Sequence, residues 1–110
     1  MVDFPDPFAE LTGFEWDKGN SEKNWHSHTV ASAEAEQAFF NRPVLVAHDF
    51  KHGQVEPRFL LLGRTDANRL LFVAFTLRGS LVRVISARVT SRRERRWYAE
   101  ALKKEAEADS

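Results

Sequence analysis

Hydrophobic and polar residues follow one another in a pattern that predicts two helices, then a run of strands, then a last helix. Large apolar side chains flank an acid over residues 14–16, which fits a brief strand. Asp17 or Ser21 can cap a helix over residues 18–28, because their short side chains accept hydrogen bonds from the free N–H groups of a first turn. The chain therefore begins with one short strand and one helix.

A second helix, four further strands and a third helix are expected beyond that point. Ser32 can cap the second helix, and Pro43 ends it because proline lacks the N–H that a helix interior needs. Four apolar or β-branched runs, separated by segments with turn-forming residues, predict strands over 44–47, 58–65, 70–77 and 81–89. The last helix begins near residue 90, where Ser91 and Glu94 have the spacing of a capping box.

These elements predict an α+β fold, with two N-terminal helices and a C-terminal helix packed on an antiparallel sheet of about four strands. The turns between the last three strands are only a few residues long, whereas a parallel crossover needs a dozen or more. The strand over 70–77 is apolar on both faces and should be central. A length of 110 residues fits one domain, with 1–13 as an N-terminal extension and 101–110 as a polar C-terminal tail.

The composition argues against several classes of protein. There is no cysteine, which excludes a disulfide scaffold and suits a reducing cytoplasm. The acidic first ten residues contain prolines and lack the pattern of a signal peptide, and no apolar run approaches the length of a membrane span. Neither a glycine-rich phosphate loop nor a G-x-S-x-G motif is present, so triad chemistry has no support. We expect a cytoplasmic protein with no cofactor.

A net charge of zero hides a division between the two halves of the chain. Residues 1–57 hold four Lys/Arg and ten Asp/Glu, whereas residues 58–110 hold twelve Lys/Arg and six Asp/Glu. Between Arg58 and Tyr98 the basic residues are ten arginines and no lysine. A guanidinium group can hold two phosphate oxygens at once and stack on a base, so this stretch indicates a polyanionic partner. The alternative is that the two halves neutralise each other within one fold.

Two arginines are expected in apolar rows of the strand over 81–89. Strict alternation places Arg83 in one row and Arg88 in the other. A buried arginine needs a partner or a ligand, because an unpaired charge is costly to remove from water. A polyanionic ligand is one interpretation. The alternatives are a side chain that extends to solvent at the sheet edge, or an ion pair with an internal carboxylate, for which Glu15 and Glu34 are candidates.

Other arginines lie at strand ends and at the start of the last helix. Arg64 and Arg78 each stand at a strand end and extend the predicted phosphate-facing surface. Arg92 and Arg96 form a like-charge pair one turn apart, with Arg95 between them, and such a pair costs about 0.3 kcal/mol. Stability alone does not favour this arrangement. The alternative is a solvated helix face without a ligand.

The four histidines all lie in the acidic half of the chain. His48, Asp49 and His52 could be read as metal ligands, but they occupy a glycine-containing loop and no fourth ligand is evident. We expect structural or exposed roles for them and no metal site. His26 and His28 fall where the first helix ends, a place that favours a protonated imidazole.

Several stretches of this sequence resemble the BrnT family of toxins from type II toxin–antitoxin systems. They are FEWD (14–17), NWHSHTVASAEAEQAF (24–39), EPRFLLLGRT (56–65) and TLRGSLVRVISARVTSRRERRWY (76–98). The last stretch is the most specific. Relatives usually carry Lys-His-Gly at the end of the first helix, where this chain has Ser27, His28 and Thr29. The histidine is thus retained, whereas the lysine and the glycine are replaced.

The resemblance implies a RelE-like fold and a ribonuclease that inhibits translation by cutting RNA. It also implies a small antitoxin with a ribbon-helix-helix domain, and contact with operator DNA only through the toxin–antitoxin complex. Cleavage of RNA without a metal needs a base, an acid and cations at the phosphate. Arginine cannot readily serve as the base. The expected catalytic residues are His28, Arg64, Arg83, Arg88 and Glu94, with His28 first for proton transfer, and the expected RNA contacts are Arg78, Arg92, Arg95 and Tyr98.

Three functional hypotheses remain open from the sequence. The first is the metal-independent toxin ribonuclease. The second is a nucleic-acid-binding or protein-binding module without nuclease activity, which would bind RNA with steep salt dependence and leave it intact. The third is a metal hydrolase that uses His48, Asp49 and His52, and its activity would disappear with a chelator.

Overall fold

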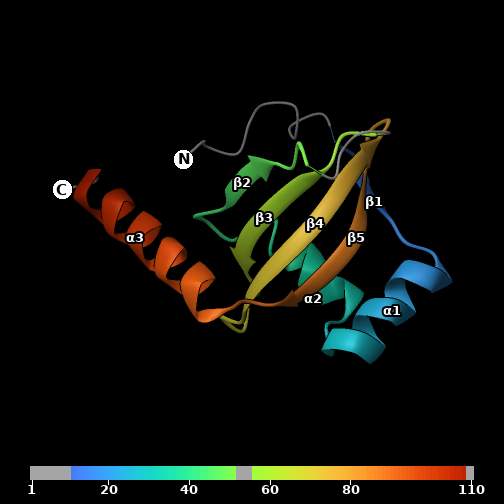
Figure 1. The fold of residues 1–110 in the computed structure, drawn as a ribbon, viewed down its shortest axis with the longest axis horizontal. Helices are drawn as coiled ribbons and strands as arrows, with labels where there is room; N and C mark the ends of the chain where they lie inside the picture. Colours follow the sequence, from blue (N-terminus) through green and yellow to red (C-terminus); the bar gives the residue numbers. More distant parts are fainter. Residues whose placement is uncertain (1–10, 52–55, 109–110) are drawn as a thin grey trace.

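The computed structural model describes residues 11–51 and 56–108, and the elements occur in the expected order (Figure 1). The chain forms β1 (Gly13–Glu15), α1 (Lys18–His28), α2 (Ser32–Gln37), β2 (Leu45–His48), β3 (Phe59–Arg64), β4 (Leu70–Arg78), β5 (Leu81–Val89) and α3 (Arg92–Ala108). The predicted α+β class is confirmed. Within these ranges, no helix is both long enough and apolar enough to span a bilayer.

The sheet of the described residues has five strands in the order β1-β5-β4-β3-β2. The four strands from β2 to β5 are antiparallel neighbours, as predicted, and β4 is central. The expected count of about four strands is one short, because β1 joins the edge of β5 as a parallel strand. This pairing joins residues almost 70 positions apart in the sequence, which local patterns do not encode.

The helices lie differently against the two faces of the sheet: α2 packs on one face, and α3 stands beside β2 and β3 on the other side (Figure 1). On the face that we call the inner face, α2 and the segments around it pack on the apolar side chains of β3, β4 and β5. The buried core on this face includes Ala35, Phe39, Leu61, Val73 and Phe75. The opposite face, called the outer face, is turned toward α3. Val73 and Phe75 on the inner face of β4 and Ala74 and Thr76 on its outer face are all buried, which explains the continuous apolar run.

One glycine allows the second helix to approach the sheet closely. A Cβ at Gly63 of β3 would lie 2.1 Å from the carbonyl oxygen of Ala38, just after α2. No side chain can occupy that space, since real Cβ atoms are essentially never nearer than 3.0 Å. The contact fixes α2 against the end of β3.

Helix α1 binds the free part of the β5 edge through two asparagines. Since β1 pairs only with the first three residues of β5, the rest of that edge needs other partners. Asn20 Nδ2 donates to the carbonyl oxygen of Val84 at 3.1 Å, and the N–H of Ala87 donates to Asn24 Oδ1 at 3.0 Å. Side-chain amides thus replace a neighbouring strand and orient α1 along β5.

The helix caps agree with the sequence in two cases out of three. Asp17 caps α1, accepting from the Asn20 N–H at 2.9 Å, and Ser91 with Glu94 forms the predicted capping box of α3. Ser32 was expected to cap α2 and does not. The helix begins one residue earlier, with Ala31 at the N-cap position. The Glu34 carboxylate accepts from the Ala31 N–H at 3.1 Å, which supplies the missing partner.

Candidate functional site

A bulge in β5 places Arg83 and Arg88 on the same face of the sheet. The register of β4 against β5 shifts by one residue in the middle, so that Ile85 is passed over. An extra residue reverses the alternation of side chains beyond it. Arg83 lies opposite Thr76 and Arg88 opposite Phe72, both on the outer face. The expectation that strict alternation separates the two arginines is therefore wrong.

Arg83 lies at the β1 end of the outer face, where carboxylates surround it. Its Nη2 is 2.7 Å from Asp17 Oδ2, and its Nη1 is 3.3 Å from Glu15 Oε2. Arg78 Nη1 lies 3.6 Å from the same Glu15 carboxylate, and Arg78 Nη2 lies 3.5 Å from Glu56 Oε1. Pairing of Arg83 with Glu15, the alternative to a ligand, is thus present. We call these five residues the Arg83 cluster.

In the Arg83 cluster, both the Arg83 guanidinium and the Asp17 carboxylate are charged at neutral pH. The Asn20 N–H and then the Arg83 guanidinium hold the pKa of the Asp17 carboxyl below its ordinary value. The hydrogen bond to Asp17 in turn raises the pKa of Arg83. Any phosphate that binds Arg83 has to displace a carboxylate that is already ionised and already in contact.

Arg88, at the other end of β5, is held rigidly. Its Nη1 and Nη2 donate to the two oxygens of Glu94 at 2.9 and 2.8 Å, which is the bidentate geometry that a guanidinium favours. Its guanidinium carbon lies 4.3 Å from the centre of the Phe72 ring. The Ser91 N–H also donates to Glu94, at 2.8 Å. Arg88 is therefore fixed from both sides before any ligand arrives.

Glu94 is suited to position Arg88 and poorly suited to act as an acid. Burial alone raises the pKa of the Glu94 carboxyl, but hydrogen bonds from Arg88 and from the Ser91 N–H prevail and leave this pKa below its ordinary value. The group is consequently an anion at neutral pH. As a base it is weakened by the same bonds, since they favour the charged form.

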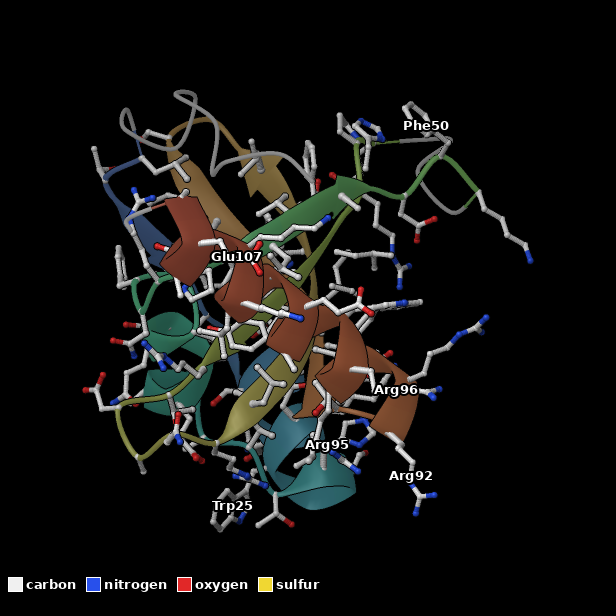
Figure 2. All side chains as sticks on the ribbon, turned by 90° about the vertical axis from the view of Figure 1, so that its left-hand side faces the viewer. Trp25, Phe50, Arg92, Arg95, Arg96 and Glu107 are labelled. Atoms are coloured by element: carbon white, nitrogen blue, oxygen red, sulfur yellow. The ribbon has the colours of Figure 1, made fainter. Side chains whose placement is uncertain are left out.

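The first turns of α3 carry further guanidinium groups next to Arg88. Figure 2 shows Arg92, Arg95 and Arg96 spreading outward from this end of the helix. Arg95 Nη1 donates to the carbonyl oxygen of Thr90 at 3.0 Å. Within the described ranges, the side chains of Arg92 and Arg96 form no hydrogen bond or ion pair. Together with Arg88, Glu94 and Arg95, they form what we call the β5–α3 cluster.

His28 lies at the end of α1 that points toward the C-terminal end of β5. Asn20, Asn24 and His28 follow one another at intervals of one turn on a single helix face. The first two bind β5 at Val84 and then at Ala87, so the third falls near the level of Arg88. In Figure 2 the Trp25 side chain of α1 lies at the same lower end of the molecule as Arg92 and Arg95.

The residue after His28 has an unusual backbone. Thr29 is in the left-handed region, with φ of 55°. That conformation suits glycine, which the related sequences are expected to carry here, and it is uncommon for a β-branched residue. Arg69 Nη1 donates to the Thr29 carbonyl oxygen at 2.9 Å and pairs with Glu34 at 3.1 Å. These bonds hold the strained turn that follows His28.

Arg64 and Tyr98 are bound to backbone oxygens near β2. Arg64 Nη2 donates to the carbonyl oxygen of Arg42 at 2.7 Å. Tyr98 is buried, and its hydroxyl donates to the Pro43 carbonyl oxygen at 2.7 Å. Burial raises the pKa of Tyr98, so the phenol stays protonated at neutral pH. Both side chains anchor α3 and the end of β3 to the segment before β2.

The predicted site residues thus divide among three places. Arg88, Glu94, Arg92 and Arg95 lie together, and α1 ends with His28 toward this end of β5. Arg64 and Tyr98 lie beside the segment before β2. Arg83 and Arg88 lie opposite Thr76 and Phe72, four residues apart on β4, so they are about 13 Å apart along the strand and the Arg83 cluster is separate. The bulge that aligns the two arginines and the aromatic ring beneath Arg88 were both missed. Neither has a sequence signal, because an extra residue in a strand shows only against its partner.

The metal interpretation of the loop after β2 gains no support from the side chains that can be described there. The His48 ring stacks on Phe50 with centroids 4.2 Å apart and meets Phe59 edge-on. Asp49 lies 3.5 Å from Arg58 Nε. His52 falls outside the described residues. Over 11–51 and 56–108, no group of three potential ligands is close enough to hold a metal ion.

The fold and the β5–α3 cluster define a small α+β protein with guanidinium groups gathered at one end of its sheet. The family described as "Ribonuclease toxin, BrnT, of type II toxin-antitoxin system" matches residues 16–94. This match spans more than half of the chain and includes Arg64, Arg83, Arg88 and Glu94. The chain belongs to the BrnT family, whose members are ribonuclease toxins with RNA as substrate and an antitoxin as partner.

A solved structure has the same fold. The crystal structure of the Brucella abortus ribonuclease toxin BrnT is 22% identical in sequence and superposes with a TM-score of 0.56. The match covers 74% of this chain and 100% of that chain. A comparison with curated proteins gave no match.

Proposed function

We propose that the chain cleaves RNA without a metal ion, at the β5–α3 cluster, and that it inhibits translation in this way. One observation carries the proposal. Arg88 is fixed by Glu94 and Phe72 beside Arg92 and Arg96, whose guanidinium groups have no partner among the described residues, and α1 ends with His28 toward the same end of β5. A preorganised cation next to free cations is what a developing negative charge on phosphorus requires.

The cleavage step uses groups of this chain in distinct roles. The 2′-hydroxyl of the RNA attacks the adjacent phosphorus, and the bond to the 5′-oxygen breaks. Arg88, with Arg92 and Arg95, binds the phosphate and stabilises its added charge. His28 takes the proton of the 2′-hydroxyl and returns it to the leaving 5′-oxygen. Glu94 is a positioning residue that acts through Arg88. Tyr98, being buried, supports α3.

The remaining predicted residues act farther from the reacting phosphate. Arg83 and Arg78 bind a neighbouring phosphate of the same strand once their carboxylate partners are displaced, and Arg64 keeps the base of α3 in place. The cognate antitoxin carries a ribbon-helix-helix domain, and the complex reaches operator DNA only through that domain.

An incubation of purified protein with an RNA oligomer, with and without EDTA, tests the proposal. Cleavage is expected in both, with 2′,3′-cyclic phosphate ends, and is expected to fail for Arg88→Gln. Arg58→Gln is the matched control, because Arg58 also pairs with a carboxylate but lies far from the cluster. Intact RNA with the wild-type protein rejects nuclease activity. Loss of cleavage with EDTA rejects the metal-independent mechanism.

A second function is favoured by one specific observation. Arg78, Arg83 and Arg88 all pair with carboxylates of their own chain, which weakens their attraction for phosphate. Such a protein can bind RNA or the antitoxin without cutting. In that case RNA binding is expected to fall steeply with salt while the RNA stays intact. Ser27 and Thr29, which stand where relatives carry lysine and glycine, also favour binding without cleavage.

A further inference from the structure

An open apolar cleft separates α3 from the outer face of β2 and β3. Its volume is about 630 Å³. Its walls include Leu45, Ala47, Leu60, Leu62, Phe72 and Trp97. These side chains come from three strands and from the helix, so the cleft is formed by the tertiary fold.

The cleft stays open because α3 stops presenting large apolar side chains to the sheet. Tyr98 and Ala101 are buried against the body of the protein. One turn later the helix presents Lys104 and Glu105 to the same space, and then Ala108. Charged groups and a methyl group cannot fill the volume above an apolar sheet. The far half of α3 therefore stands off the strands, and its end projects from the body (Figure 1).

The free chain leaves apolar surface in water at this place. The Trp97 side chain is 49% exposed although it lines the cleft, and Ala47 is exposed as well. Monomeric proteins rarely expose continuous apolar surface of this kind without a use for it. An RNA strand does not supply the aliphatic side chains that would fill it.

The cleft leads directly to the β5–α3 cluster. Phe72 lines the cleft and carries Arg88 on its ring, at 4.3 Å. Trp97 lines it from the other side, and the Arg93 guanidinium lies 5.5 Å from the Trp97 ring centre. A chain lying in the cleft thus continues to Arg92 and Arg96, whose side chains have no partner among residues 11–51 and 56–108. A segment complementary to this surface has apolar residues in the cleft and acidic residues at the end near Arg92 and Arg96.

We propose that the cleft is the docking site for a segment of the antitoxin that carries bulky apolar residues followed by acidic residues. The apolar residues fill the space above Leu60 and Leu62, and the acids pair with Arg92 and Arg96. This inference rests on the proposed function, because the family supplies the antitoxin. A second copy of this chain fits less well, since a symmetric pairing would place one basic cluster beside the other.

Binding of the antitoxin at this cleft blocks the RNA site directly, so neutralisation of the toxin needs no change in its conformation. The acidic end of the segment occupies the guanidinium groups that bind RNA, while the apolar part supplies affinity that does not depend on salt. RNA has only the charges to bind with, so it loses the competition at the same site. Affinity for the antitoxin should consequently fall less with salt than affinity for RNA does.

The test uses Ala47→Arg, which places a long charged side chain at an exposed position inside the cleft. Leu102→Arg is the matched control, because Leu102 is 39% exposed on α3 and does not line the cleft. The probe is the product of the neighbouring reading frame that rescues cells from the wild-type toxin. Purified antitoxin is titrated into each toxin variant, and RNA cleavage and growth are measured in parallel.

Ala47→Arg is expected to cut RNA and arrest growth like the wild type, while its affinity for the antitoxin falls about 30-fold or more. Leu102→Arg keeps the wild-type affinity. Unchanged binding and rescue of Ala47→Arg overturn the proposal. If circular dichroism shows that Ala47→Arg is misfolded, Ala108→Trp, at the exposed end of α3, replaces it, and the same two outcomes decide the proposal.

Other occupants of the cleft give different results. If the free toxin is a dimer that Ala47→Arg separates, a second copy occupies the cleft and the proposal fails. If removal of residues 1–10 accelerates hydrogen exchange in β2 and β3, the chain covers its own cleft, and the proposal fails as well. A wild-type protein that leaves RNA intact refutes the proposed function, but the titration still decides the docking question.

Discussion

The pair formed by Arg88 and Glu94 should be coupled in stability, and a double-mutant cycle measures the coupling. Arg88→Met removes two hydrogen bonds and leaves the Glu94 side chain, which is 10% exposed, without its cation. Breaking a buried pair costs about 3 kcal/mol or more, and the Ser91 N–H that stays bound reduces this to about 2 kcal/mol. For a domain of this size, that lowers Tm by about 8 °C.

The double variant Arg88→Met/Glu94→Gln should recover most of the loss. Glutamine keeps the capping box and leaves no buried charge without a counterion. The free energy of unfolding of the double variant is therefore expected within about 1 kcal/mol of the wild type. Urea unfolding followed by tryptophan fluorescence gives the free energies. The double variant should be folded and unable to cut RNA. If it cuts RNA at the wild-type rate, Arg88 does not bind the scissile phosphate. If it is no more stable than Arg88→Met, the pair is not coupled.

Acid titration of the wild type and of Arg88→Met should show opposite dependences of stability on pH. In the wild type the pKa of Glu94 is below its unfolded value, so its stabilising contribution is present above the unfolded value of about 4.3 and is lost as pH falls through the folded pKa. Without Arg88, burial becomes the main influence on that carboxyl and raises its pKa. Arg88→Met should therefore lose stability as pH rises from about 4 to 6. Parallel curves for both proteins contradict this account.

Three further predictions concern the backbone and the Arg83 cluster. Thr29→Gly should stabilise the protein by about 1 kcal/mol, because φ of 55° suits glycine, and an unchanged or lower Tm would refute it. Gly63→Ala should cost about 3 kcal/mol through collision with a backbone carbonyl, whereas Gly13→Ala, with a Cβ contact of 3.8 Å, should leave urea unfolding nearly unchanged. Asp17→Asn keeps the helix cap and frees Arg83 from its nearest carboxylate. RNA binding measured by anisotropy should become tighter, and equal affinity would show that no competition exists.

The sequence was sufficient for the features that depend on neighbouring residues. The helix over 18–28 and the strand over 81–89 have the predicted bounds, because caps, turns and apolar periodicity all act within a few residues. The Ser91 and Glu94 capping box was predicted from spacing alone and is present. Glu94 was also expected to be catalytic, as a titratable group in the mechanism that the family resemblance implies, but its bidentate bond to Arg88 became visible only in the fold.

The features that were missed depend on residues far apart in the chain. The bulge at Ile85 exists only relative to β4, so no pattern within β5 could indicate it. The parallel pairing of β1 depends on which edge of the sheet is left free. Arg83 could be assigned either to a ligand or to Glu15 from the sequence, and only the register of β1 against β5, which sets Glu15 opposite Arg83, selects the ion pair.

The contrast between paired and unpaired arginines indicates an order of events at the RNA surface. Arg92 and Arg96 carry no internal counterion among the described residues, so they exert the strongest attraction on an approaching strand. Arg88 is already bound to Glu94, and its exchange of a carboxylate for a phosphate is favourable only after the strand is held nearby. Initial capture at α3 followed by transfer to Arg88 predicts that Arg92→Gln/Arg96→Gln slows association, whereas Arg88→Gln leaves association fast and removes cleavage. Stopped-flow binding at low salt separates the two, and equal association rates for both variants would contradict this order.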